Sequence, residues 1–246
     1  EVRALEAFLA DPRPRIEDLD RLELRWGGSQ LRLWKVGRDR VQAGRWGSEL
    51  RKAWEDRLLA LDVSPFLRGW ALRHALCFAL AEEDGERFGQ LREALEEEAP
   101  DLFQAFQRAF GLLGGPAPRF PLWTLPDLEP VELNLAEHPG ARVHIGPASG
   151  DPIRVPSDAT LWIVPTELGG QPVAEPFLQG REAHEAQELA ERFRRSGLRG
   201  YVAASRRPFE AVALVFFPAL LDVDEQGRLR SIRMGDAARP QPKPIP

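Results

Sequence analysis

The sequence predicts an α+β fold built from two modules. A proline- and glycine-rich segment, 111–130, interrupts the chain, and proline removes a backbone donor that helices and central strands need. Short alternating runs and helical patterns precede the segment, whereas strand and helix patterns follow it. We therefore expect an N-terminal three-stranded antiparallel meander with a four-helix cluster, then a mixed or antiparallel sheet covered by one amphipathic helix.

The predicted boundaries follow the prolines. Residues 1–115 form a β-meander plus helical module, and residues 131–235 form an α/β sandwich module. Residues 116–130 are a proline-rich connector whose apolar side chains pack against both modules. The tail RPQPKPIP ends the chain, so we expect 236–246 to be extended, because alternating prolines suit that conformation.

The first module begins with a short helix at 2–10, which the Asp11-Pro12 pair ends. Apolar and charged residues alternate in the next segments, and the Gly27-Gly28 turn separates the first two of them. The three expected strands of the meander are 21–26, 31–36 and 40–46.

Four helices are expected to follow the meander. Ser64 is a good helix cap and Pro65 suits a first helical position, and the helix that they open is apolar on most sides. The Gly114-Gly115 pair ends the last helix. The expected helices are 48–61, 64–81, 86–98 and 100–113.

The second module alternates strands with one helix. Segment 181–195 carries the clearest amphipathic stripe, which Ser196-Gly197 ends, and 224–227 has the composition of a hairpin turn. A proline- and glycine-bearing loop is expected at 166–176. The expected strands are 131–136, 142–146, 160–164, 201–205, 211–217 and 229–234.

The composition of the 246 residues is that of a globular protein, with 43% hydrophobic and 29% charged residues and a net charge of −5. Cys77 is the single cysteine, so an internal disulfide is excluded. The longest apolar run, 211–221, is too short to cross a bilayer. We expect a cytoplasmic protein without a metal, without a cofactor and without a membrane partner; the oligomeric state is left open.

Basic and aromatic residues gather in 21–57, where ten Arg and Lys stand against five acids and three tryptophans are interleaved. Aromatic faces beside guanidinium groups stack bases and neutralise phosphates, so the patch indicates single-stranded nucleic acid as a partner. Core packing of the tryptophans is the simpler interpretation. The candidate binding residues are Arg25, Arg32, Trp34, Lys35, Arg38, Arg40 and Arg45.

Catalytic motifs are incomplete. The run at 222–227 begins like a calcium loop, but Arg233 occupies the position where a bidentate acid is required. A scattered active site would have to gather His138, His144, Asp151 or Asp222.

Our leading hypothesis is a non-enzymatic binding or scaffold protein that acts through a protein partner or an assembly surface. The apolar side chains of 116–130, the acidic segment 82–98 and the proline tail motivate it. Single-stranded nucleic-acid binding is the alternative, and an enzyme with a scattered site is the third hypothesis.

Overall fold

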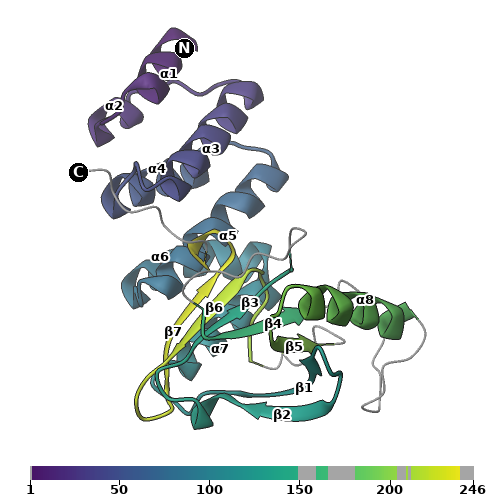
Figure 1. Ribbon diagram of the computed structural model, residues 1–246. Coiled ribbons are helices and arrows are strands. Elements are labelled where there is room, and N and C mark those ends of the chain that lie inside the picture. The colour runs from purple at the N-terminus through teal and green to yellow at the C-terminus, as the bar shows by residue number, and fades with distance from the viewer. Residues whose placement is uncertain (1, 149–158, 166–180, 204–208, 210–211, 239–246) are drawn as a thin grey trace. The chain divides into compact units, whose positions relative to one another are not determined.

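The computed structural model describes residues 2–148, 159–165, 181–203, 209 and 212–238. The described chain divides into two compact units, unit 1 up to Ala79 and unit 2 from Leu80 to Ala238 (Figure 1). The division falls well before the predicted connector at 116–130. The predicted loop at 166–176, Asp151 and the tail from residue 239 lie outside the described residues.

Unit 1 is helical. Helix α1 packs on α3, α2 packs on α4, and α3 packs on α4, so two successive helical layers form (Figure 1). Helix α5 follows and belongs to unit 1 as far as Ala79. The helices are α1 (Val2–Ala10), α2 (Ile16–Asp20), α3 (Gly27–Gln42), α4 (Ser48–Ala60) and α5 (Pro65–Ala81).

The predicted meander is wrong, because helix α3 occupies the segments at 31–36 and 40–42. The residues that α3 buries recur at helical spacing: Leu33, Gly37 and Val41 follow one another every four residues. Residues 21–25 alternate as expected, with Leu22 and Leu24 buried between exposed neighbours, but Trp26 is exposed and does not join the leucines, and the segment forms no strand. The same alternation of apolar and charged residues therefore belongs to an extended segment at 21–25 and to part of a helix at 31–36.

Tryptophan packing holds α3 against α4. The indole rings of Trp34 and Trp54 stack with centroids 5.2 Å apart, and the Trp54 Nε1 donates to the Leu33 carbonyl at 3.2 Å. Gly37 makes this approach feasible, since a Cβ there would lie 2.5 Å from the Trp54 ring. Trp46 meets Trp54 edge-on at 5.9 Å. Together these rings form the centre of the unit 1 core.

Unit 2 begins with two helices, α6 (Gly85–Glu98) and α7 (Pro100–Leu112), close to where the sequence placed them. Asp84 caps α6, because its carboxylate accepts from the Arg87 amide at 2.8 Å. Pro100 starts α7, where its missing N–H costs nothing. The four predicted helices between 48 and 113 are thus confirmed, and α2 is an addition that the sequence did not indicate.

A seven-stranded mixed sheet makes up the rest of unit 2, in the order β2-β1-β5-β4-β3-β6-β7. The β3–β4 and β4–β5 pairs are parallel and the other pairs are antiparallel. The expected mixed sheet and the 224–227 hairpin turn are confirmed. The strands are β1 (Arg119–Leu125), β2 (Pro130–Asn134), β3 (Arg142–Ile145), β4 (Leu161–Pro165), β5 (Gly200–Ala203), β6 (Ala219–Val223) and β7 (Leu229–Met234).

Strand β1 lies inside the segment that the sequence assigned to a connector. It pairs with β2 through residues 119–123 and with β5 only through residues 123–125. Pro121 therefore stands where β1 has one neighbouring strand, and a missing N–H is tolerated on the unpaired side. Phe120, Leu122 and Leu125 are buried as expected for apolar residues there, but within unit 2.

Two C-terminal expectations also need correction. The strand predicted at 211–217 is absent from described residues 212–217, where Val212 and Leu214 donate to the Phe209 carbonyl and close a turn. Strand β6 begins later, at Ala219. Residues Gly235–Ala238 form a short 3-10 helix, η2, in place of the start of an extended tail. A short apolar run has the same composition whether it forms a strand or a buried turn, so composition alone did not distinguish the two at 212–217.

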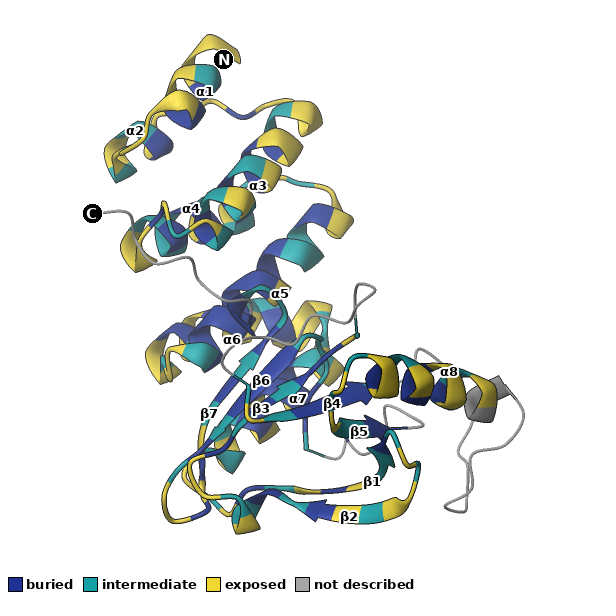
Figure 2. Cartoon of the chain, viewed as in Figure 1, coloured by how far each residue is buried: buried dark blue, intermediate teal, exposed yellow. Residues whose placement is uncertain are grey.

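Helix α8 (Arg181–Arg195) covers part of one sheet face, and its predicted bounds are confirmed. Leu189, Ala190 and Phe193 pack with side chains of β1, β4 and β5 into one buried cluster (Figure 2). Its exposed face is polar, as the sequence pattern indicated. None of the described helices combines the length and apolar character that a bilayer crossing requires.

Replacement of Gly37 tests the tryptophan packing. We expect Gly37→Ala to destabilise the chain by about 1–3 kcal/mol, because the new methyl group overlaps the Trp54 ring. The matched control is Gly28→Ala in the same helix, where a Cβ meets nothing within 4 Å and stability should hold or rise. Urea denaturation followed by tryptophan fluorescence measures both. A neutral Gly37→Ala would contradict the packing.

Candidate functional site

A shallow apolar groove in unit 1 is the first candidate site. The Trp26 side chain is 71% exposed, the most exposed of the large hydrophobic side chains that the structure describes. It shares a hollow of about 410 Å³ with Val2 and Leu5 of α1. We call this hollow the Trp26 groove; its lining is Val2, Leu5, Glu6, Trp26, Gly28, Ser29 and Arg32.

Local structure explains why Trp26 faces outward. Leu22 and Leu24 point inward, and Gln30 fixes the segment by donating to the Leu24 carbonyl at 2.9 Å. Trp26 then caps α3 through its backbone, whose carbonyl accepts from the Ser29 and Gln30 amides. Its indole is therefore left beside the first turn of the helix and outside the core.

Charges border the groove. Arg32 of α3 and Glu6 of α1 form an ion pair at 2.6 Å across it. Two exposed cations are close to residues that line the groove: Arg3 follows Val2 in the chain, and Lys35 lies three residues after Arg32 on α3. Neither forms an ion pair with another described residue. Exposed large hydrophobic side chains occur in unit 1 only, as far as the described chain shows: Val2, Trp26, Leu31 and Phe66.

The residues predicted to bind nucleic acid do not share one platform. Trp34 lies in helix α3 and not in the expected strand, is 4% exposed and stacks on Trp54. Arg40 donates to the Leu9 carbonyl at 2.8 Å, a structural role. Arg25, Arg32, Lys35 and Arg45 are exposed, and Arg38 is half-buried. Binding of single strands by this set stays a prediction.

A buried charged cluster lies in the unit 1 core. The Glu55 carboxylate, fully buried, contacts Arg51 Nη1 at 3.1 Å and His74 Nδ1 at 2.8 Å. A carboxylate only accepts, so His74 donates from Nδ1 and its Nε2 has no hydrogen-bond partner in the described chain. Arg51 also lies over the Phe78 ring at 4.3 Å. The cluster is sealed by aromatic rings and has a structural role.

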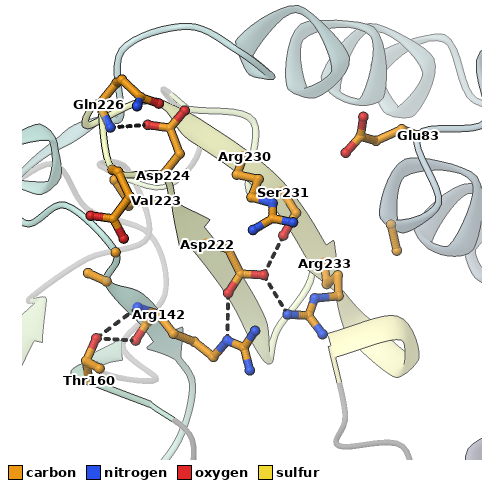
Figure 3. A pocket seen from close by; sticks show the side chains of 14 residues that line it. Glu83, Arg142, Thr160, Asp222, Val223, Asp224, Gln226, Arg230, Ser231 and Arg233 are labelled. Atoms are coloured by element: carbon orange, nitrogen blue, oxygen red, sulfur yellow. Dashed lines mark hydrogen bonds and ion pairs between the residues drawn. The ribbon is translucent and has the colours of Figure 1, made fainter.

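The second candidate site is a polar hollow of about 980 Å³ in unit 2 (Figure 3). Asp222 of β6 lies at its centre. Its carboxylate accepts from Arg142 Nε of β3 at 2.6 Å, from Ser231 Oγ of β7 at 2.7 Å and from Arg233 Nη2 of β7 at 2.8 Å. Strand pairing causes this convergence, because Arg142 and Ser231 both lie opposite Asp222 in register.

The environment of Asp222 keeps it ionised. Partial burial raises the pKa of this carboxyl, but hydrogen bonds from Ser231 and Arg142 and the charge of Arg233 outweigh the burial and hold the pKa below its ordinary value. Asp222 is therefore a fixed anion and unsuited to act as a general base near neutral pH.

The scattered residues of the enzyme hypothesis are only partly placed. His144 and Asp222 lie on neighbouring strands, but His144 pairs in register with Leu220, and its ring meets Trp162 edge-on at 6.3 Å. His138 follows the short 3-10 helix η1 (Leu135–Glu137). Within the described ranges, no three His, Cys, Asp or Glu side chains gather as a metal site. Sequence reasoning missed Arg142 and Arg233, which strand alternation alone does not single out.

Comparison with known proteins gives no match to a family model, to a curated protein or to a solved structure.

Loss of the buried carboxylate tests the unit 1 cluster. We expect Glu55→Gln to cost about 3–5 kcal/mol, because the substitution removes the buried carboxylate that Arg51 and His74 share. Glu49→Gln, exposed on the same helix, should change stability by less than about 0.5 kcal/mol. Urea denaturation compares the two. Equal small effects would show that the cluster is not as buried as described.

Asp222 gives a pH dependence of known sign. Because its pKa is lowered by folding, the unfolded chain binds more protons near pH 4, and the stabilisation is complete above the ordinary value of 3.8 and lost as the pH falls through the lowered value. The stability deficit of Asp222→Asn should therefore be largest at neutral pH and shrink in acid. Exposed Asp127→Asn is the control, and urea midpoints across pH are the measurement. A deficit that grows in acid would contradict the assignment.

Proposed function

We propose that this chain is a binding or scaffold protein without enzymatic activity, and that the Trp26 groove binds an apolar segment of a protein partner. The observation that supports the proposal is a tryptophan 71% exposed at the edge of an apolar hollow. Removing an exposed indole from water on association is strongly favourable, and tryptophan dominates the energetic centres of protein interfaces.

Charge complementarity indicates the kind of partner. Arg3 and Lys35 are exposed on α1 and α3, the two helices that contribute to the groove, and form no ion pair in the described chain; the segment 21–57 has five more basic than acidic residues. A partner segment with acidic residues beside its apolar anchor fits this border, and opposite charge also steers its approach. We therefore propose an apolar segment with acidic flanks as the occupant.

The helical layers of unit 1 are consistent with this role. Stacked helix pairs such as α1-α2 on α3-α4 resemble the layers of α-solenoids, which serve as binding surfaces for other proteins. The resemblance is one of architecture, so the proposal depends on the groove itself. We also propose a cytoplasmic location for this chain and for the protein partner that the groove would bind.

Single-stranded nucleic acid is the second candidate. The exposed cations Arg25, Lys35 and Arg45 favour it, through neutralisation of phosphates. Burial of Trp34 removes one stacking surface that this function would use.

A photocrosslinking amino acid at position 26 tests the proposal. We expect it to capture one polypeptide from an extract of the source cells, whereas the same group at Glu17, exposed on α2, should not. With that partner purified, Trp26→Ala should weaken binding at least about tenfold and Glu17→Ala should leave it unchanged. Higher salt should slow association, because the charges around the groove are exposed.

Three outcomes would contradict the proposal: equal capture from positions 26 and 17, an unchanged Kd for Trp26→Ala, or crosslinks to nucleic acid alone. The last result would favour the second candidate. A crosslink to a second copy of this chain, with a matching increase in mass by light scattering, would contradict a foreign partner and show that the groove mediates self-assembly.

A further inference from the structure

Strand β2 ends the sheet of unit 2 on one side and pairs with β1 alone (Figure 1). We propose that the free edge of β2 is a strand-addition site, which binds an extended segment of a protein partner in which basic and apolar residues alternate. The site belongs to unit 2, so the proposal does not rest on the Trp26 groove.

The register of the β1–β2 pair shows which backbone groups of β2 are already used. The amide of Leu135, directly after β2, donates to the Pro118 carbonyl at 3.1 Å. Every second residue of an antiparallel strand bonds to the same neighbour, so Leu133 and Val131 also direct their N–H and C=O groups toward β1.

The residues between them, Pro130, Glu132 and Asn134, direct their backbone groups to the outer edge. Glu132 and Asn134 each present an N–H and a C=O there, whereas Pro130 presents a C=O only. None of these groups has a hydrogen-bond partner in the part of the chain that the structure describes. An extended peptide that pairs with β2 supplies partners for both donors and for the carbonyls.

The opposite edge of the sheet, at β7, is covered. The Leu229 amide donates to the Gly115 carbonyl and the Leu229 carbonyl accepts from the Gly114 amide, both at 2.8 Å. Further along β7, Ile232 is fully buried, whereas Glu132 in β2 is exposed. Proteins commonly cover or pair their sheet edges, so the open edge of β2 is the one available to a partner.

Charge selects the partner. Residues 119–137, which hold β1 and β2, carry four exposed acids and one exposed cation, a net charge of −3: Asp127, Glu129, Glu132, Glu137 and Arg119. A second copy that paired through β2 about a two-fold axis at Glu132 would set this carboxylate opposite its own copy, which is destabilising. A basic segment is attracted to the same edge.

The two faces of β2 define the pattern of the partner segment. Glu132 is exposed on one face, whereas Val131 is half-buried and Leu133 is buried on the other. Residues that lie directly opposite each other on neighbouring strands share a face. The partner residue opposite Glu132 is therefore Lys or Arg, and those opposite Val131 and Leu133 are apolar.

Amide hydrogen exchange followed by NMR tests the site. The probe is a capped heptapeptide of alternating lysine and valine, added to the full chain at low salt. We expect it to slow exchange of the Glu132 and Asn134 amides at least about tenfold, because these amides become hydrogen-bonded. The amides of Val131 and Leu133, already bonded to β1, should change little.

Two further peptides separate strand addition from charge attraction. The same heptapeptide methylated on the backbone nitrogens of its lysines keeps its charge but loses the donors for β2, and a glutamate-valine heptapeptide reverses the charge. Both should bind at least about tenfold more weakly. Absence of saturable binding by the probe, or equal binding of the methylated peptide, would overturn the proposal. Protection of both outer amides that rises with the concentration of the chain alone would assign the edge to a second copy and also overturn it.

Variants of one residue locate the binding. Glu132→Gln removes the charge and should weaken binding about threefold. Glu132→Pro also removes the outward donor and should weaken it at least about tenfold, while the bonds from Val131 and Leu133 to β1 remain. Glu191→Gln, exposed on α8, is the control and should have no effect. If Glu132→Pro fails to fold, Glu132→Gln decides: an affinity equal to that of Glu191→Gln would overturn the proposal.

Discussion

The close approach of α3 and α4 at Gly37 is the constraint on which unit 1 depends. Because Gly37 lacks a side chain, Trp54 lies against the α3 backbone, stacks on Trp34 and bonds to the Leu33 carbonyl. This core buries three of the chain's seven tryptophans: Trp34, Trp46 and Trp54. Trp26, one turn before the buried part of α3, is left for the surface, and this contrast makes it a candidate contact for a partner.

Much of the fold could be predicted where local signals and packing agree. The Ser64-Pro65 start, the Pro100 start and the stripe of 181–195 gave helices within a few residues, because caps and a single apolar face act locally. The strand prediction for 31–36 was wrong for a physical reason. Apolar and charged residues alternate over these six positions as they do in a strand, but the segment belongs to a helix, which buries the adjacent Leu33 and Trp34. Only the longer repeat through Gly37 and Val41 distinguishes the two.

The candidate sites were less predictable, because they depend on pairing between distant segments. Arg142 and Asp222 are eighty residues apart, and the register of β3 with β6 brings them together. Strand β1 shows the same limit. The proline at 121 favoured a connector in the sequence analysis, but Pro121 is tolerated in β1 because only β2 pairs with the strand at that position. The sequence predicts Gly27-Gly28 as a turn between two strands, whereas Trp26 is the N-cap residue of α3 and the glycines begin that helix.

Hydroxyl-radical footprinting with mass spectrometry of each tryptophan tests the central claim, that unit 1 buries its aromatic stack and presents Trp26. Reactivity follows solvent exposure, so Trp26 at 71% should be oxidised at least about tenfold faster than Trp34 at 4% and Trp54 at 0%. Trp34 oxidised as fast as Trp26 would contradict the account, because it would place that ring on an open surface and remove the packing at Gly37.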